Sequence, residues 1–591
     1  MKCPRSKTVC ALIGLLSVIS CADSCSGKIN TMCEKSNEDS PRSDQPHIIT
    51  IIADDLGWND VSFHGHDQIP TPNIDALAAN GVILNRYYVQ PTCTPSRTAF
   101  LTGRYPLRAG MQGIPLTTGE RWGIPVDIPL FPGHLRNLGY TTRLLGKWHL
   151  GYYTVDHVPT QRGFDSFVGY YNGYIKYFDH TIRQDKTNET GYDLHRDDRQ
   201  KLTIERNKDY FTDFLTEEVE DVIKSHDVSK PLYLQIAHLA PHSGEPEEPL
   251  EVWNVTEVNL TLGYIKDINR RKFAGMVTRL DNSVGRTIKA LKNAGMLENS
   301  IVIFTTDNGA QTEGLHVNYG SNYPLRGLKF SMFDGGVRGV GCIYSPLIVN
   351  SSRVSNELMH ITDWMPTLYS AAGGDVKVLG ELDGVDQWPT LKYGLKSPRT
   401  SLLLHVDEKF KVAGAVMGKF KFLQGNQVNY TDFYGDSGDG DNYPPYSAAS
   451  VVSSAAGQAI SQISESVATP QQIISLRLKT KMSCPPFQEY VNCTSRCLFD
   501  LSVDPCETVN LSEQHPEIVE LMESYIEKYQ DVLVQQSSGL YDRTSSPAKF
   551  NGAWMPWIKF NHNDESASLL EVPQTSSAGD IIMNLRSIRQ S

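Results

Sequence analysis

The chain carries the run His47-Ile48-Ile49-Thr50-Ile51-Ile52-Ala53 and, directly after it, the pair Asp54-Asp55. The run is apolar at almost every position and has the length of a strand, without the alternation of a strand that faces water on one side. Continuous apolar runs are typical of strands buried on both faces, as in a parallel sheet that helices cover. This stretch therefore predicts the core of an α/β fold.

Three further runs of the same kind occur at residues 141–145, 231–237 and 301–305. Between them lie segments with helical periodicity, at residues 211–225 and 273–294. Strands that alternate with helices indicate a mostly parallel sheet flanked by helices. The larger part of the chain is therefore predicted to be α/β.

The C-terminal part of the chain has a different pattern of predicted strands and helices. A chain of 591 residues exceeds the ~250–300 residues at which a single core stops growing, so at least two domains are expected. Residues 411–423 read as two short strands that meet near Gly418, as in an antiparallel sheet, and residues 517–529 read as a helix. We predict a large domain over residues 45–397 and a smaller α+β domain over residues 398–560.

Three segments are predicted to lack fixed structure. Residues 433–470 are rich in Gly, Ser, Ala and Asp and are expected to form a mobile insertion. Its acidic residues do not have the spacing of an EF-hand, so a solvated loop is favoured over a calcium loop. Residues 23–44 are expected to be flexible, and residues 561–591 to be a disordered tail.

The N-terminus has the layout of a secretory signal. A short basic segment precedes an apolar run at residues 9–19 and small residues at 20–22, which predicts a signal peptide over residues 1–22. The run is too short for a membrane anchor, and no later stretch is long enough to span a membrane. A bacterial lipoprotein signal at Cys21 is the other alternative. Seven sequons favour instead a eukaryotic glycoprotein with N-glycans, secreted or lysosomal: Asn188, Asn254, Asn259, Asn350, Asn429, Asn492 and Asn510.

The net charge argues against one class of partner, and the cysteine content predicts disulfides. The net charge of −12 argues against nucleic acid as a partner, because phosphate binding needs a basic surface. Cys25 and Cys33 are a candidate local pair, and Cys342 is a candidate free core thiol. Four cysteines crowd one C-terminal segment and are predicted to form two disulfides whose pairing the spacing leaves open: Cys484, Cys493, Cys497 and Cys506.

Each predicted strand leads into polar side chains. Ligands of open α/β sheets bind at the carboxyl ends of parallel strands, so such residues can converge on one site. Carboxylate and amide oxygens suit Ca²⁺ or Mg²⁺, whereas zinc prefers His and Cys. A turn with a helix cap is the alternative reading of an Asp pair after a strand. The polar residues after the four runs are Asp54, Asp55, Lys147, His149, His242, Asp307 and Asn308.

One cysteine stands in an unusual context, Cys93-Thr94-Pro95-Ser96-Arg97. Pro95 suits the first turn of a helix, where its missing N–H costs nothing. This placement puts Cys93 at a helix N-terminus, where backbone N–H groups favour an anion, and Arg97 can bind oxyanions from the next turn. By itself the pattern fits either a thiol nucleophile of low pKa or an inert cysteine.

The chain resembles the type I sulfatases from Cys93 to Arg104, which matches their signature Cys-x-Pro-Ser-Arg followed by Leu-Thr-Gly-Arg. Within that family, Trp58-Asn59-Asp60 and Gly335-Gly336-Val337-Arg338-Gly339 are similar to the arylsulfatase B group, the N-acetylgalactosamine-4-sulfatases. The similarity runs from about residue 47 to 557 and implies an alkaline-phosphatase-like large domain. Other motifs that resemble the family are Ala53-Asp54-Asp55-Leu56-Gly57, Gly146-Lys147-Trp148-His149-Leu150-Gly151, Thr306-Asp307-Asn308-Gly309 and Pro324-Leu325-Arg326-Gly327-x-Lys329.

The resemblance implies a modified nucleophile and a metal ion. Cys93 would be converted to formylglycine by a formylglycine-generating enzyme, and the hydrate of that aldehyde would attack sulfur. One Ca²⁺ per subunit is implied, with these ligands: Asp54, Asp55, Asp307, Asn308 and the modified Cys93.

The resemblance also assigns roles to five other side chains. Arg97, Lys147 and Lys329 would neutralise the sulfate oxygens and the charge that develops on them. His242, alone or with Lys329, would protonate the leaving oxygen. His149 would take the proton from the second hydroxyl of the hydrate, which releases sulfate.

The substrate implied is a sulfate ester of a glycosaminoglycan-type glycan, with N-acetylgalactosamine 4-sulfate of chondroitin or dermatan sulfate favoured. The chain departs from arylsulfatase B in having no cysteine between residues 102 and 194, which leaves the hexosamine specificity open. The alternatives are another sulfated polysaccharide or an aryl sulfate, a phosphonate or phosphodiester hydrolase of the same superfamily, and a non-catalytic extracellular glycan-binding protein on this fold.

Overall fold

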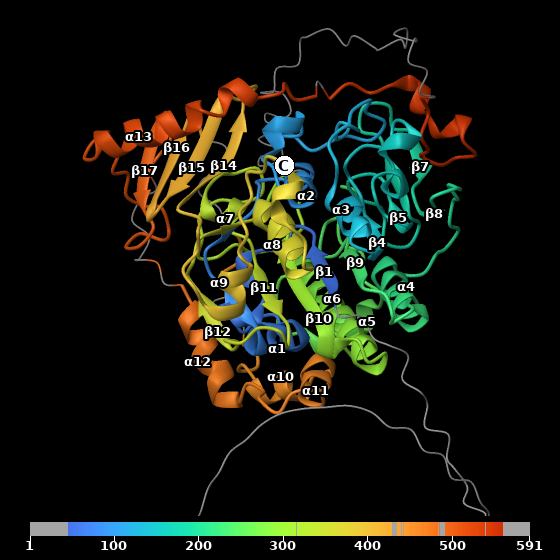
Figure 1. Ribbon diagram of the computed structural model, residues 1–591, viewed down its shortest axis with the longest axis horizontal. Helices are drawn as coiled ribbons and strands as arrows, with labels where there is room; N and C mark the ends of the chain where they lie inside the picture. Colours follow the sequence, from blue (N-terminus) through green and yellow to red (C-terminus); the bar gives the residue numbers. More distant parts are fainter. Residues whose placement is uncertain are drawn as a thin grey trace, which may run out of the picture. The chain divides into compact units, whose positions relative to one another are not determined.

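The strand β1 (His47–Ala53) lies inside a nine-stranded sheet (Figure 1). The computed structural model describes residues 45–558 except 315, 428–433, 439, 441, 483, 485–490 and 538. The predicted signal peptide, the segment 23–44 with Cys25 and Cys33, and the tail 561–591 lie outside the described residues.

The large sheet is mixed and mostly parallel. Its strands follow the order β12-β2-β11-β10-β1-β9-β4-β5-β8, and the five from β10 to β5 run parallel to one another. β11 and β8 run antiparallel to their neighbours β10 and β5. The other strands are β2 (Val82–Leu84), β4 (Thr141–Lys147), β5 (Ser166–Tyr170), β8 (His195–Asp198), β9 (Leu232–Ala237), β10 (Ser300–Thr306), β11 (Gly341–Tyr344) and β12 (Arg353–Ser355).

The four apolar runs of the sequence are the strands β1, β4, β9 and β10, as predicted. Every residue of β1, β9 and β10 is buried, which is why these runs show no alternation. The predicted helix at 211–225 is α4 (Phe211–Ser225), and the one at 273–294 is part of α6 (Ile268–Asn293). α6 begins earlier because the Asp267 side chain accepts hydrogen bonds from the backbone N–H groups of Asn269 and Arg270.

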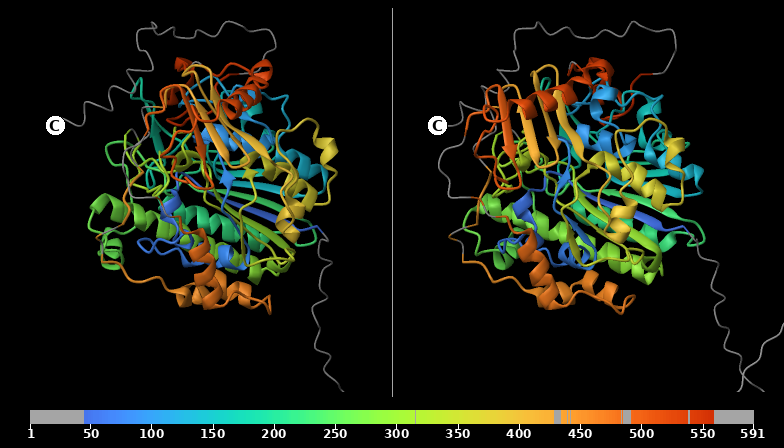
Figure 2. Two further views of the ribbon diagram at one scale, coloured as in Figure 1. Left: turned by 90° about the vertical axis from the view of Figure 1, so that its left-hand side faces the viewer. Right: turned by 60° about the vertical axis from the view of Figure 1, so that its left-hand side comes forward.

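Helices cover both faces of the large sheet (Figure 2). One layer contains α6, which contacts α1, α4, α5 and α11. The other contains α2, α3, α8 and α9. Within it, α8 contacts α2, α3 and α9, and α2 also contacts α3. These helices are α1 (Pro72–Asn80), α2 (Cys93–Thr102), α3 (Phe131–Asn137), α5 (Val255–Thr261), α8 (Trp364–Ala371) and α9 (Trp388–Tyr393).

A second, antiparallel sheet follows in the C-terminal part, as predicted. It contains β14 (Ser401–Asp407), β15 (Val412–Met417), β16 (Phe420–Gln424) and β17 (Arg496–Asp500). β15 and β16 form a hairpin around Gly418, which has a φ of 58°. One face of the sheet packs on Met332 and Phe333, and the other packs on α13 (Pro516–Glu527).

The segment predicted as a mobile insertion differs from that expectation. It contains α10 (Ala448–Ser453) and α11 (Ala455–Ser461), and α12 (Pro470–Thr480) follows. α11 packs on α6, and the small residues Ala456 and Gly457 are buried there. Gly457, a residue type that suggested mobility, allows a close approach to α10, since a Cβ there would lie 2.3 Å from the carbonyl oxygen of Val451. Asp439 and Asp441 of the acidic loop lie outside the described residues.

The end of the described chain returns to the large sheet's side of the molecule. Tyr541 bridges to Glu120 and Ala553 bridges to Tyr192, and Trp554 is fully buried. These contacts and the helices α10–α12 attach described parts of the segment after residue 398 to the large sheet and its helices. The predicted domain boundary at residue 397 stays a prediction.

The C-terminal cysteines form two bridges, as predicted, with Cys484 joined to Cys506 and Cys493 joined to Cys497. Cys93 and Cys342 are buried free cysteines. Among the described residues, the helices are all too short or too polar to be candidates for crossing a membrane.

Candidate active site

The predicted site residues converge where β1, β4 and β10 end. Asp54 and Asp55 follow β1, and Asp307 and Asn308 follow β10, its parallel neighbour. Gly309 allows this edge to close tightly, since a Cβ there would lie 1.8 Å from the carbonyl oxygen of Gly335. Side chains far apart in the sequence are thus brought to one edge of the sheet, as expected for an open α/β fold.

Cys93 is the first residue of α2 and points at the carboxylates. Its Sγ lies 3.6 Å from Asp54 Oδ1 and 3.9 Å from Asp55 Oδ1. The Asn308 side-chain amide donates to Asp55 Oδ1 at 2.6 Å. Asp55 has a φ of 60°, a conformation that non-glycine residues rarely adopt and that clusters at functional sites.

Three buried cations face these carboxylates. Lys147 Nζ lies 2.6 Å from Asp54 Oδ2, and Lys329 Nζ lies 2.8 Å from Asp55 Oδ2. Arg97 donates to Asp307 Oδ2 from Nε at 3.1 Å and from a terminal nitrogen at 2.8 Å. The centre therefore holds negative charge and has cations around it.

The two predicted histidines also belong to the cluster. His242 Nε2 lies 3.5 Å from Asp55 Oδ2 and 3.5 Å from Lys329 Nζ, while its Nδ1 lies 2.5 Å from the carbonyl of Ser243. His149, with a φ of 58°, has Nε2 at 2.8 Å from the carbonyl of Leu116. Since a carbonyl only accepts, Nε2 of His149 carries the proton and its Nδ1 is free to accept one.

Burial dominates the protonation behaviour of the site. Burial, with the nearby Asp307, raises the pKa of Asp54 to about 7. Burial raises the pKa of the Cys93 thiol to about 12, so the cysteine as encoded is a poor thiolate nucleophile. Burial also lowers the pKa of both His149 and His242 well below the usual value, which keeps His149 neutral and able to accept a proton.

Several buried polar atoms of the site have no partner within the described chain: Arg97 Nη1, Asn308 Oδ1, His149 Nδ1 and the hydroxyl of Tyr170. Unpartnered buried polar groups are uncommon and call for an explanation. A site with three carboxylates, a raised Asp54 pKa and an unpaired amide oxygen fits a hard divalent cation. The remaining donors fit an anionic ligand beside it.

Sequence reasoning missed three side chains at this site. Asn318 donates to the carbonyl of Asp55 at 2.8 Å and so fixes the strained residue. Tyr170 lies at the end of β5, and burial, with the nearby Asp54, raises the pKa of its hydroxyl. Tyr174 stacks on the ring of His242 with centroids 5.7 Å apart. These residues lie in loops or at a strand end with no distinctive spacing, and only tertiary contacts reveal them.

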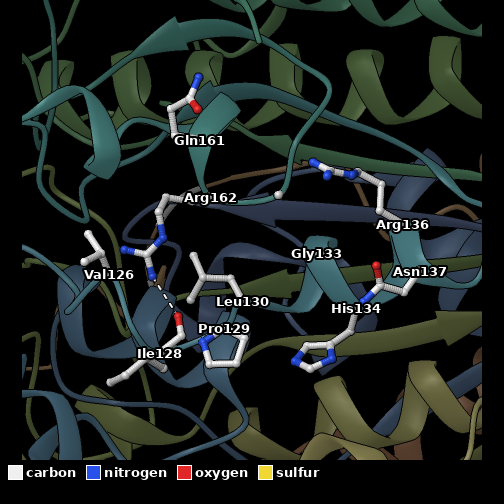
Figure 3. Close-up of a pocket in the computed structure, with 11 residues that line it drawn as sticks. Val126, Ile128, Pro129, Leu130, Gly133, His134, Arg136, Asn137, Gln161 and Arg162 are labelled. Atoms are coloured by element: carbon white, nitrogen blue, oxygen red, sulfur yellow. Dashed lines mark hydrogen bonds between the residues drawn. The ribbon is translucent and has the colours of Figure 1, made fainter.

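A separate cavity of about 330 Å³ lies beside α3 (Figure 3). Its wall includes Arg162, whose guanidinium donates to the carbonyls of Ile124, Pro125 and Ile128. The cavity has no cysteine, serine or carboxylate among its lining residues. It therefore does not compete with the Cys93 centre as the place of chemistry.

Comparison with known proteins identifies the family. The family model "Sulfatase" matches residues 46–374, and the chain belongs to this family. It is a sulfuric ester hydrolase by that membership. The strands that end at the Cys93 centre all lie within the matched region.

Relatives and solved structures agree with this assignment. The chain is 36% identical to arylsulfatase J of Mus musculus, over 87% of this chain and 81% of that protein. It is 29% identical to N-acetylgalactosamine-6-sulfatase of Rattus norvegicus, over 59% of this chain and 66% of that protein. It also resembles the crystal structure of Ps i-CgsB in complex with k-i-k-neocarrahexaose, with a TM-score of 0.63, 26% identity, and coverage of 83% and 94%.

Proposed function

We propose that this sulfatase hydrolyses sulfate esters of glycosaminoglycan-type glycans, with N-acetylgalactosamine 4-sulfate as the favoured substrate. We further propose that Cys93 acts after conversion to formylglycine and that Ca²⁺ is bound beside it. The observation that carries the proposal is the position of Cys93, at the start of α2 and within 3.6 Å and 3.9 Å of two of the three clustered aspartates.

The proposed metal ligands are Asp54, Asp55, Asp307, Asn308 and the modified Cys93. When bound, Ca²⁺ would withdraw electron density from the sulfate oxygens and so make sulfur more open to attack. Formylglycine would supply a nucleophilic oxygen that an unmodified thiol with a pKa of about 12 does not supply. Conversion requires a formylglycine-generating enzyme as a partner during biosynthesis.

The protein's own cations would hold the sulfate group. Arg97, Lys147 and Lys329 are fixed by ion pairs to three different aspartates. Donors that are held in advance stabilise developing charge without reorganising during the reaction. Their arrangement around one centre suits a tetrahedral anion, since Lys147 approaches from the end of β4, Arg97 from α2 and Lys329 from the loop before α7 (Asp334–Val337).

The two histidines would transfer protons in two different steps of the reaction. Nδ1 of His149 would accept a proton, because Nε2 is committed to the carbonyl of Leu116. Nε2 of His242 faces the cluster 3.5 Å from the ammonium of Lys329, and His242, alone or with Lys329, would protonate the leaving oxygen. General acid and base steps of this kind typically contribute about 10²–10⁴-fold to the rate.

Support for the substrate comes from resemblance. The motifs at residues 58–60 and 335–339 are similar to N-acetylgalactosamine-4-sulfatases, while one relative is named an N-acetylgalactosamine-6-sulfatase. A solved relative was crystallised with k-i-k-neocarrahexaose, which favours another sulfated polysaccharide as the second candidate. A secretory route, with secreted or lysosomal destination and N-glycans, is proposed from the N-terminal segment and the sequons.

The test combines a mass measurement with a substrate panel. The tryptic peptide containing Cys93, from protein made in a eukaryotic secretory host, should have the mass expected for the change from CH₂SH to CHO. The protein should then cleave N-acetylgalactosamine 4-sulfate faster than the 6-sulfate and faster than carrageenan oligosaccharides. An unmodified Cys93 in a host that converts a control sulfatase would contradict the mechanism and favour a non-catalytic glycan-binding protein.

Two further comparisons separate the remaining alternatives. A faster reaction with a carrageenan oligosaccharide would replace the favoured substrate but keep the sulfatase mechanism. Faster cleavage of an aryl phosphonate than of the matching aryl sulfate would point to the phosphonate hydrolase alternative.

A further inference from the structure

A second buried charge cluster lies between the small sheet and the segment that carries Lys329. Lys421, on β16, has its Nζ 2.7 Å from Asp334 Oδ1 and 2.8 Å from Glu507 Oε1. All three side chains are fully buried. Arg338 pairs with the other oxygen of Asp334 at 3.2 Å. We call Lys421, Asp334, Glu507 and Arg338 the junction cluster.

The junction cluster joins two parts of the protein at a high desolvation cost, because its charged side chains are removed from water. Burial raises the pKa of Glu507 to about 7, even though Lys421 lowers it. Buried ion pairs are often replaceable by apolar side chains of similar volume with no loss of stability. Glu507 also has a φ of 57°, a strained backbone conformation. Stability alone therefore gives a poor account of why charges occupy this place.

The contacts of Asp334 lead directly to the active site. Asp334 begins α7 (Asp334–Val337), and its backbone N–H donates to Glu507 Oε2 at 2.6 Å. Within α7, the carbonyl of Gly336 accepts a hydrogen bond at 3.0 Å from the N–H of Gly309, the residue after Asn308. A shift of α7 would therefore move the strand end that carries the predicted metal ligands.

The same segment also fixes Lys329. The N–H of Gly335 donates to the carbonyl of Arg326 at 2.7 Å, which closes the loop around Lys329. The N–H of Lys329 donates to the carbonyl of Ala310 at 3.1 Å. The backbone on both sides of Lys329 is thus tied to α7 or to the end of β10.

We propose that Lys421 is a positioning residue for sulfate ester hydrolysis: by holding Asp334 and Glu507, it keeps α7 in the position that aims Lys329 and Asn308 at the Cys93 centre. Lys421 does not touch the reacting atoms and acts only through α7. The small sheet would then form part of the catalytic scaffold, since its central strand β16 supplies the ammonium. This inference rests on the proposed function for its kinetic readout only.

The test compares Lys421→Met with Phe422→Leu. Phe422 is the next residue of β16, is fully buried and faces α13 on the opposite side of the sheet, so its substitution weakens the same strand without touching Asp334. Both variants are measured at a temperature where circular dichroism finds them folded. The readouts are kcat and KM with an aryl sulfate, and the Ca²⁺ dissociation constant of metal-free protein by calorimetry.

We expect Lys421→Met to lower kcat by about 100-fold with KM within about threefold, as for a displacement of the catalytic groups by about 1 Å. The Ca²⁺ dissociation constant should rise by about 10-fold, the lower end of the range for residues that orient metal ligands. Phe422→Leu should lower Tm while kcat and Ca²⁺ affinity stay within about twofold. Equal losses of kcat in both variants, or none in Lys421→Met, would overturn the proposal.

A double variant separates a positioning role of Lys421 from a loss of kcat that is caused only by misfolding. Lys421→Met combined with Glu507→Gln removes the ammonium and the carboxylate that pairs with it, while Asp334 keeps its ion pair with Arg338. The double variant therefore contains no buried unpaired carboxylate and should recover Tm. We expect kcat to stay low, because the tether of α7 is still absent. Recovery of kcat together with Tm would mean that the cluster is merely structural. If the wild-type protein hydrolyses no sulfate ester, the proposed function fails, while the Ca²⁺ titrations still decide whether Lys421 positions the ligands.

Discussion

The active site and the junction cluster are both buried groups of carboxylates and cations, but they differ in completeness. In the junction cluster every charged side chain has an ion-pair partner, with N···O distances of 2.7, 2.8 and 3.2 Å. Around Cys93, ion pairs of similar length coexist with unpartnered atoms on Arg97, Asn308 and His149. Burial and charge are the same in the two regions. Among the described residues, the active site has several buried polar atoms without a hydrogen-bond partner, whereas the junction cluster has one, Glu507 Oε1, which the ammonium of Lys421 approaches to 2.8 Å.

This difference separates two uses of buried charge. Completely paired groups hold parts of the backbone in place, whereas unpaired atoms keep a desolvation cost that only a ligand or substrate relieves. The unpaired set is therefore the better marker of where chemistry takes place. Four experiments test whether unpaired buried atoms mark the place of chemistry in this protein.

The largest effect is expected at Cys93. Cys93→Ser should lower kcat by about 10⁴-fold or more, as loss of a nucleophile does in other enzymes, when hydrolysis of an aryl sulfate is measured. Cys342→Ser is the matched control, because Cys342 is also a buried free cysteine but lies in the core strand β11. It should cost about 1–3 kcal/mol of stability and leave kcat within about twofold. Similar kcat losses in both would refute the special role of Cys93.

The next effect compares two buried histidines. His149 has an unpartnered Nδ1, whereas His360 has both ring nitrogens within 3.1 Å of polar groups of Gln90 and Thr362. His149→Gln should lower kcat by about 10²–10⁴-fold and produce a burst of alcohol release, because sulfate release becomes slow. His360→Gln should change Tm rather than kcat. Loss of activity without a burst would place the role of His149 in an earlier step.

Removal of divalent cations should have an intermediate effect. Chelation leaves three buried carboxylates near one another, so Tm should fall, and Ca²⁺ at 100 times its dissociation constant should restore about 2.7 kcal/mol. Differential scanning calorimetry with and without Ca²⁺ measures this shift. Asp54→Asn should abolish the response to Ca²⁺. A Tm that is independent of Ca²⁺ in the wild type would mean that the cations already present satisfy the carboxylates.

The smallest effect concerns the sequons, where the same contrast of paired and unpaired groups applies. The Asn510 amide donates to the carbonyl of Arg496, and its oxygen accepts from the N–H of Leu498 and of Ser512. Asn188 is exposed and directly follows the turn at residues 185–187. We expect Asn188→Gln to remove the mass of one glycan and Asn510→Gln to remove none, at a cost of about 1 kcal/mol. Intact mass spectrometry gives both results, and a glycan on Asn510 would contradict them.

The fold was predictable where the burial of a segment determines which of its residues are apolar. β1, β9 and β10 are buried on both faces and so are apolar throughout, and the periodicity of α4 gave its bounds. α11 was not predictable, because Ala and Gly are read as flexible although Gly457 allows close packing of α11 on α10. The edge strands β2 and β12 are only three residues long, too short for a pattern.

The site was predictable for a different reason. Asp54, Asp307 and Lys147 directly follow or end strands, so topology alone brings them together. The resemblance of the motif around Cys93 to the sulfatase signature supplied the proposed nucleophile and its proposed chemistry. Lys421 and Asn318 contact residues that are distant in the sequence. No local spacing in the sequence predicts such contacts. The junction cluster is therefore visible only in three dimensions.

The burial of Cys93 also constrains the order of events during synthesis. Its side chain is only 1% exposed, so under the proposed function the modifying enzyme would have to reach the thiol before the sheet closes. β1 pairs with β9 and β10, which begin at residues 232 and 300. Until the ribosome has made those strands, the centre of the sheet has no neighbours and the segment around Cys93 stays open. The long sequence separation of the central strands thus provides a time window for modification that a fold with local pairing would close early.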